Sequence, residues 1–100
     1  MRVVLSVLAR QELTEARRYL DKIQPGLGNR LADEVRAAAV RITRFPLAYP
    51  VQLGEIRKCL LHRFPYKLLY AVRTDRIVVV AVAHQHRHPD YWVERIGKPE

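Results

Sequence analysis

The stretch YKLLYAVRTDRIVVVAVA, residues 66–83, decides the fold because it joins two strand-like runs by a very short turn. Between Tyr66 and Arg73, side chains alternate between two faces, with the larger apolar residues on one face, a period-two pattern typical of a strand. Arg76–Ala83 is an almost continuous apolar run, which predicts a central strand buried on both faces. Thr74-Asp75 is the turn, although it lacks the glycine that tight hairpins favour. The stretch therefore predicts an antiparallel hairpin at the heart of a sheet.

Two amphipathic helices precede this hairpin. Apolar residues recur at steps of three and four within Ala9–Ile23 and again within Leu27–Phe45, the spacing of a helical stripe. Ser6 is suited to cap the first helix, Pro25-Gly26 ends it, and Pro46 stops the second. Because only a few residues join the two helices, we expect an antiparallel helix hairpin whose apolar stripes face the sheet.

The remaining strands complete an α+β arrangement. RVVLSVL, residues 2–8, predicts a short N-terminal strand, and Glu55–Leu61 predicts another strand after the irregular segment PLAYPVQLG. The expected fold is an N-terminal strand and a two-helix antiparallel hairpin packed on one face of an antiparallel sheet of three to four strands. One hundred residues predict a single domain, 1–100, that buries roughly 60–65% of its unfolded surface. We expect the opposite face of the sheet to be less covered and to carry many of the cations.

Composition excludes several classes of protein. Apolar residues make up 49% and charged residues 28% of the chain, as in ordinary globular proteins. The longest apolar run, Ile77–Ala83, is too short to span a membrane, and the N-terminal segment does not match a secretory signal peptide. The single cysteine, Cys59, excludes an internal disulfide and a zinc knuckle, and it fits a reducing compartment. We therefore expect a cytoplasmic protein.

The charge points to an acidic partner. Eighteen Lys and Arg residues stand against ten acids, a net charge of +8. The surplus is larger in residues 57–100, which hold nine Lys and Arg, four acids and all four histidines. Such a field attracts polyanions and acidic protein segments, although a basic surface can also serve solubility alone.

The segment AVAHQHRHPDYW, residues 81–92, raises the question of a metal site. His84 and His86 are two residues apart, so on a strand both rings can turn to one ion. A zinc site needs a third or fourth ligand, yet Asp90 is the only nearby carboxylate and Arg87 would repel a cation. Ligand number and local charge therefore argue against a metal.

Other enzyme classes lack their residues. No serine lies between glycines in a strand–turn–helix context, and no acids are paired for glycoside hydrolysis. The GLG sequence between the two helices matches no phosphate-binding loop. These classes are excluded.

What remains is cationic chemistry without a metal. Cleavage of RNA by its own 2′-hydroxyl needs a base, an acid for the departing oxygen, and fixed cations around the phosphate. Neutral histidine serves as base or acid near pH 7, arginine holds phosphate bidentately, and an exposed aromatic ring stacks on a base. Alternatively, the Lys and Arg side chains only provide an exposed strand with a water-facing surface. Trp92 then only closes one end of the core.

Nearly the whole chain, from about residue 3 to residue 93, resembles the RelE/ParE superfamily of toxins from bacterial type II toxin–antitoxin modules. The matching segments are ARQELTEARRYL, PGLGNRLADEVRAAAVRITRFPLAYP, IRKCLLHRFPYKLLYAV and AVAHQHRHPDYW. FPYKLLY followed by AVAHQHRHPDYW is the most specific part. The resemblance implies a helix hairpin on a curved antiparallel sheet, and an acidic or amphipathic antitoxin that wraps the basic toxin.

The resemblance also implies one of two activities, and a basic binding module without catalysis is a third possibility. Some members cleave mRNA in the ribosomal A site without metal or cofactor, whereas others inhibit DNA gyrase and have no RNase site. For cleavage, the implied catalytic residues are His84, His86, Arg87 and Tyr91, and the implied nucleic-acid-binding residues are Arg57, Lys58, Arg63, Lys67 and Trp92. The chain departs from RNase members at the apolar C-L-L before the FPY strand and at His86, where arginine is frequent. The sequence interpretation favours cleavage over gyrase inhibition.

Overall fold

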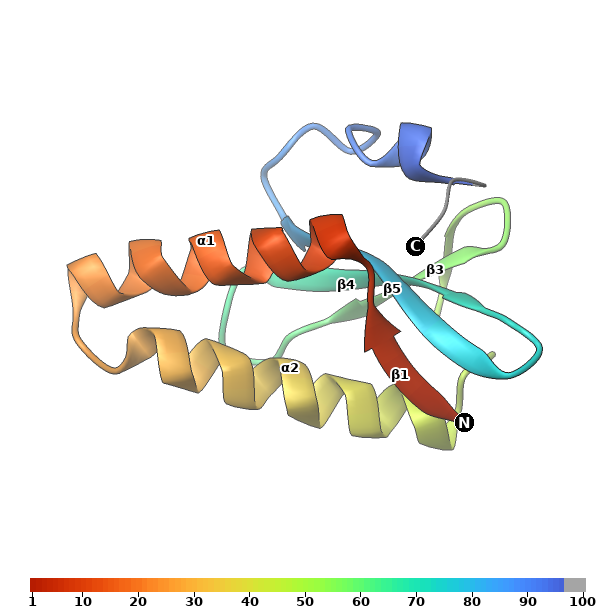
Figure 1. Cartoon of the computed structure of the whole chain (residues 1–100). Coiled ribbons are helices and arrows are strands. Elements are labelled where there is room, and N and C mark those ends of the chain that lie inside the picture. The colour runs from red at the N-terminus through yellow and green to blue at the C-terminus, as the bar shows by residue number, and fades with distance from the viewer. Residues whose placement is uncertain (97–100) are drawn as a thin grey trace.

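The computed structural model describes residues 1–96 and contains two helices and five strands (Figure 1). The elements in chain order are β1 (Arg2–Leu5), α1 (Val7–Ile23), α2 (Leu27–Arg44), β2 (Val51–Leu53), β3 (Ile56–Leu60), β4 (Tyr66–Val72), β5 (Arg76–His84) and a short 3₁₀ helix, η1 (Val93–Arg95).

The strands form one mixed sheet in the order β1-β5-β4-β3-β2. β1 is parallel to β5, and the other three pairings are antiparallel. The predicted α+β fold is confirmed, with two differences. The sheet has five strands because Val51–Leu53 pairs with β3 although Pro50 and Gly54 flank it, and the β1–β5 pair is parallel.

The first helix begins earlier than the sequence predicts. The Ser6 hydroxyl accepts a hydrogen bond from the backbone N–H of Ala9 at 3.1 Å, so the predicted N-cap is confirmed. The predicted strand 2–8 is wrong beyond Leu5, because this cap starts the helix at Val7. Val7 and Leu8 are therefore exposed in the first turn of α1 rather than in a strand.

Apolar cores lie on both faces of the sheet. The larger core is enclosed by the two helices and includes Leu31, Ile42, Leu68 and Tyr70. The smaller core lies on the opposite face and is closed by Trp92, which is 1% exposed. The expectation of a less covered second face is wrong over this area, because the segment after β5 folds back across it (Figure 1).

A bulge at Val80 interrupts the regular alternation of β5. The adjacent β4 residues Tyr70 and Leu69 pair with Val79 and Ala81, so Val80 has no partner in β4. Val80 and Ala81 consequently both pack in the smaller core. Val82 returns to the helix side, and the later residues of β5 keep this shifted alternation.

Candidate functional site at the end of β5

His84 is the last residue of β5, and the bulge directs it toward the helices. It pairs across the sheet with Tyr66, and the two rings meet edge to face with centroids 5.1 Å apart. The ring of His86 lies 5.3 Å from that of His84. The spacing thus does bring these two predicted histidines together.

Backbone N–H groups bind one ring nitrogen of each of two histidines. The N–H of His86 donates to His84 Nδ1 at 3.1 Å, and the N–H of Asp90 donates to His88 Nδ1 at 3.2 Å. A nitrogen that accepts a hydrogen bond carries no proton, so each neutral ring is the Nε2–H tautomer. His84 and His88 therefore present a donor at Nε2 and lack the free lone pair that a general base needs there.

Tyr91 is held by a carboxylate that the sequence interpretation did not single out. Its hydroxyl donates to Glu12 Oε2 at 2.6 Å, and Arg95 Nη1 donates to Glu12 Oε1 at 2.8 Å. Burial, followed by the hydrogen bond to Glu12, raises the pKa of Tyr91 far above its usual value. Arg87 lies over the Tyr91 ring, 3.9 Å from its centroid. The hydroxyl is thus engaged within the protein.

Glu12 and its partner Arg95 also form hydrogen bonds with the backbone around the β5 bulge. Its Oε1 accepts from the Val82 N–H at 3.0 Å, and Arg95 Nη1 donates to the Val80 carbonyl at 2.9 Å. The sequence did contain a signal for Glu12. It lies three residues after Ala9 and four before Ala16, at the border of the buried stripe of α1.

The predicted cations do not converge on the histidines. Arg57 pairs with Tyr70, shares its helix-facing side of the sheet and donates to the Tyr49 carbonyl at 2.8 Å. Tyr66, the partner of His84, is four residues from Tyr70 along β4, about 13 Å at the rise of a strand. Lys58 is adjacent to Arg57 in β3 and therefore faces the opposite side.

The other predicted nucleic-acid ligands are also separated. Lys67 pairs with Ala83, so it lies on the face away from the helices and from His84. Arg63 is exposed in the turn before β4, where its backbone N–H donates to Glu34. Trp92 is buried, and its indole N–H donates to the Pro89 carbonyl at 2.7 Å, as expected of a residue that closes the core.

A shallow hollow of about 220 Å³ adjoins His84. It is bordered by Tyr19 and Glu15 of α1, Tyr66 of β4, and Arg87. Its tyrosines and carboxylates come from elements that the sequence interpretation did not connect with the histidines. Across residues 1–96, no three His, Cys, Asp or Glu side chains are grouped to hold a metal ion.

Comparison with known protein families identifies the family to which this chain belongs. The model of the ParE toxin of the type II toxin–antitoxin system parDE matches residues 3–89. The chain belongs to the ParE toxin family. This confirms the resemblance to RelE/ParE toxins, and membership of the ParE family implies an antitoxin protein as a partner.

A solved structure supports the fold of this ParE-family chain. The structure titled "Chromosomal ParDE TA system from P. aeruginosa" matches with a TM-score of 0.71 and 15% sequence identity, covering 84% of this chain and 95% of that one. No curated protein sequence matches. In the part of the ParE-family chain that the structure describes, neither helix has the length and apolar character of a membrane span.

Proposed function

We propose that this ParE-family toxin inhibits DNA gyrase by binding, without cleaving RNA, and is neutralised by its antitoxin. The observation that carries the proposal is the bulge at Val80, because it puts His84 on one face of the sheet while Lys58 and Lys67 lie on the other. The proposal reverses the preference for RNA cleavage that the sequence alone supports.

Metal-free RNA cleavage needs its base, acid and cations around one phosphate. The neutral His84 ring offers an Nε2–H rather than a base, and the Tyr91 hydroxyl donates to Glu12. Arg57 is engaged with the Tyr49 carbonyl at the far end of the β3–β4 pair. This distribution supports a toxin that acts through its surface rather than through proton transfer.

The surface offers a basic region for such contacts. His86, Arg87 and His88 are exposed together in the turn after β5, and the chain carries a net charge of +8. Long-range attraction of this kind favours association with acidic surfaces. The same charge suits an acidic antitoxin, and an antitoxin is the partner that the ParE family implies.

Ribosome-dependent mRNA cleavage is the second candidate. The proximity of His84 and His86, with Arg87 next in the chain, favours it, since an Nε2–H can protonate a departing oxygen. It would require His86 to serve as the base, with cations beyond Arg87 coming from residues outside this cluster or from the ribosome.

One experiment separates the two candidates. The toxin is induced in growing cells, and both the 5′ ends of translated mRNA and the supercoiling of a reporter plasmid are followed. Gyrase inhibition predicts relaxed plasmid and intact messages at the first loss of growth. New 5′ ends within codons, with supercoiling unchanged, would contradict the proposal.

A further inference from the structure

Two turns of the chain lie side by side at one end of the sheet. The first, residues 61–65, joins β3 to β4, and the second, residues 85–88, follows β5 (Figure 1). The backbone N–H of Gln85 in the second turn donates to the Pro65 carbonyl of the first at 2.8 Å. The two turns therefore form one continuous surface, which we call the turn surface.

The turn surface is rich in fixed cations and hydrogen-bond donors. Arg63 and Arg87 are exposed, one in each turn, and Lys67 follows the first turn in β4. All the histidines of the chain lie in the two turns or directly beside them: His62, His84, His86 and His88. A neutral histidine ring donates through one nitrogen, and a guanidinium group holds phosphate oxygens bidentately. These are the groups that bind phosphate.

The nearby carboxylates leave both arginines available. The carboxylates in or beside the turn surface are Glu12, Glu15, Glu34 and Asp90. Glu12 pairs with Arg95, and Glu34 accepts the backbone N–H of Arg63. Glu15 and Asp90 are exposed, but among residues 1–96 neither Arg63 nor Arg87 forms an ion pair with a carboxylate. A bound phosphate would therefore displace water, not a carboxylate, from the two guanidinium groups.

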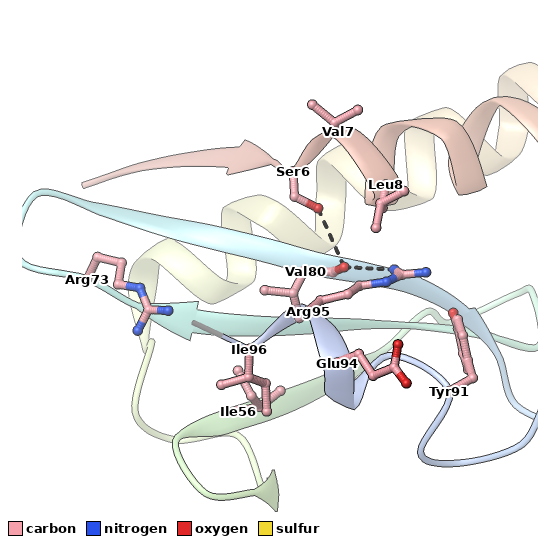
Figure 2. Close-up of a pocket in the computed structure, with 10 residues that line it drawn as sticks. All are labelled: Ser6, Val7, Leu8, Ile56, Arg73, Val80, Tyr91, Glu94, Arg95 and Ile96. Carbon is pink, nitrogen blue, oxygen red and sulfur yellow. Dashed lines mark hydrogen bonds between the residues drawn. The ribbon is translucent and has the colours of Figure 1, made fainter. Parts of the chain in front are cut away.

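The aromatic rings of this region are packed into the protein. Trp92 is 1% exposed, and Phe64 and Tyr66 pack against the larger core. Tyr91 lies at one end of a cavity of about 280 Å³ between α1, β5 and the segment after β5 (Figure 2). Arg87 covers the Tyr91 ring at 3.9 Å. Because proteins bind single strands by stacking bases on exposed rings, the turn surface suits the backbone of a duplex better.

Binding to a duplex backbone does not need the convergence of groups that RNA cleavage needs. Arg63, Arg87 and Lys67 come from the first turn, the second turn and β4, so they are spread over the surface. Duplex DNA carries a negative charge for about every 1.7 Å of its axis, so each cation can meet a different phosphate. An acidic protein would need carboxylates matched to these three positions, whereas duplex DNA of any sequence suffices.

We propose that the turn surface binds the phosphate backbone of the DNA duplex on which gyrase acts. The inference rests on the proposed function for the source of the DNA, because the charge and stacking arguments concern the duplex alone. Contacts with both gyrase and its DNA hold the toxin more strongly than either contact by itself.

The test compares two double variants that remove the same charge. Arg63→Gln with Arg87→Gln alters the turn surface, and Arg10→Gln with Arg18→Gln alters exposed arginines of α1 that line a different hollow. Fluorescence anisotropy measures the affinity of each for a labelled duplex without gyrase. We expect the turn-surface pair to bind about tenfold more weakly or worse, and its slope of log affinity against log salt to be shallower by about two. The α1 pair should lose less than about threefold.

Three results would overturn the proposal. Equal losses in the two pairs would mean that net charge, and not the turn surface, governs binding. Tighter binding to a single-stranded RNA of equal length would mean that bases stack, for which Tyr19 offers an exposed ring beside His84. Loss of antitoxin binding with DNA binding intact would assign the turn surface to the antitoxin.

Inhibition of gyrase by the same proteins separates this inference from the proposed function. We expect the turn-surface pair to need a concentration about tenfold higher than the original chain to inhibit supercoiling. Inhibition by both at equal concentrations would contradict the inference and leave gyrase as the target. Undiminished supercoiling with the original chain would refute the proposed function, and with it gyrase as the source of the DNA.

A second turn-surface pair covers the case in which the first does not fold. Arg87 packs over the Tyr91 ring, so its replacement removes a contact as well as a charge. If circular dichroism shows the first pair to be unfolded, Arg63→Gln with Lys67→Gln removes the same charge and leaves that contact in place. It should show the same loss of DNA affinity relative to the α1 pair, and equal affinities would overturn the proposal.

Discussion

Glu12 joins three parts of the molecule through one carboxylate. It accepts from the Val82 N–H, from the Tyr91 hydroxyl and from two nitrogens of Arg95. Its side chain is only 12% exposed, so water compensates poorly for any bond that is lost. The attachment of the C-terminal segment to α1 therefore depends strongly on this one residue.

Glu12→Gln is expected to destabilise the fold by about 2–4 kcal/mol, because the amide loses the charge that Arg95 pairs with and offers one acceptor oxygen. Urea unfolding measures the change. Glu15→Gln is the control, since Glu15 is exposed one turn along the same helix, and it should change stability by less than about 0.5 kcal/mol. Equal effects of the two variants would refute this account of Glu12.

Two tyrosines should make the fold sensitive to alkali. Burial raises the pKa of Tyr70 from its usual 10 to about 12, and its hydroxyl donates to the Pro46 carbonyl at 2.6 Å. The pKa of Tyr91 is raised for similar reasons. An unfolded tyrosine loses its proton near pH 10 while the folded one keeps it, so the stabilisation is complete below pH 10 and is lost as pH rises toward 12.

The slope of stability against pH tests this sign. Above pH 10 each such tyrosine contributes a loss of at most about 1.4 kcal/mol per pH unit. Unfolding by urea between pH 9 and 11.5 should show a shallower slope for Tyr70→Phe than for the original chain. An unchanged slope in this variant would show that Tyr70 ionises equally in both states.

At the scale of elements, Gly28 sets the distance between the two helices. A Cβ atom there would lie 2.8 Å from the Arg17 carbonyl oxygen and 2.8 Å from Asp21 Oδ2. The Gly28 N–H also donates to Asp21 Oδ1 at 2.8 Å, which fixes the start of α2 against α1. The backbone carbonyl cannot move aside as a flexible side chain could.

Gly28→Ala should therefore destabilise the fold by about 1–3 kcal/mol, although alanine is the better helix former. Thermal unfolding is a sufficient measurement. Arg30→Ala, at an exposed position in the same helical turn, serves as the control and should have little effect. A stabilised Gly28→Ala variant would mean that the two helices separate without cost.

The elements themselves were largely predictable from the sequence. The helical stripes, the Ser6 cap and the alternation of β4 are local patterns, and all three are confirmed. The bulge at Val80 was not predictable. Arg76–Ala83 is buried on both faces, so its apolar run contains no polar residue to reveal which face each side chain occupies.

The candidate site was less predictable because it depends on that bulge. A regular strand would have placed His84 on the face of Lys58 and Lys67, the lysines that the sequence interpretation grouped with it in one RNase site. Glu12 and Tyr91 are 79 residues apart, and their contact follows only from the path of the chain after β5. Residue types indicated a basic, histidine-containing surface, whereas the grouping of those residues required the tertiary structure.

At the scale of the whole molecule, the charge of +8 should govern how quickly the antitoxin is captured. Raising the salt concentration from 0.05 to 0.5 M should lower the association rate constant about tenfold or more, with a smaller effect on dissociation. Stopped-flow fluorescence with the full-length antitoxin measures both rates. A rate constant independent of salt would mean that the basic surface does not steer this encounter.

If the proposed function is correct, toxicity comes from binding to gyrase and not from proton transfer by the histidines. The decisive measurement is the supercoiling of relaxed plasmid by purified gyrase at rising concentrations of the original chain and of a His84→Ala, His86→Ala double variant. We predict inhibition by both proteins at concentrations that agree within about threefold, each protein having first been confirmed as folded. Undiminished supercoiling in the presence of the original chain would show that gyrase is not the target.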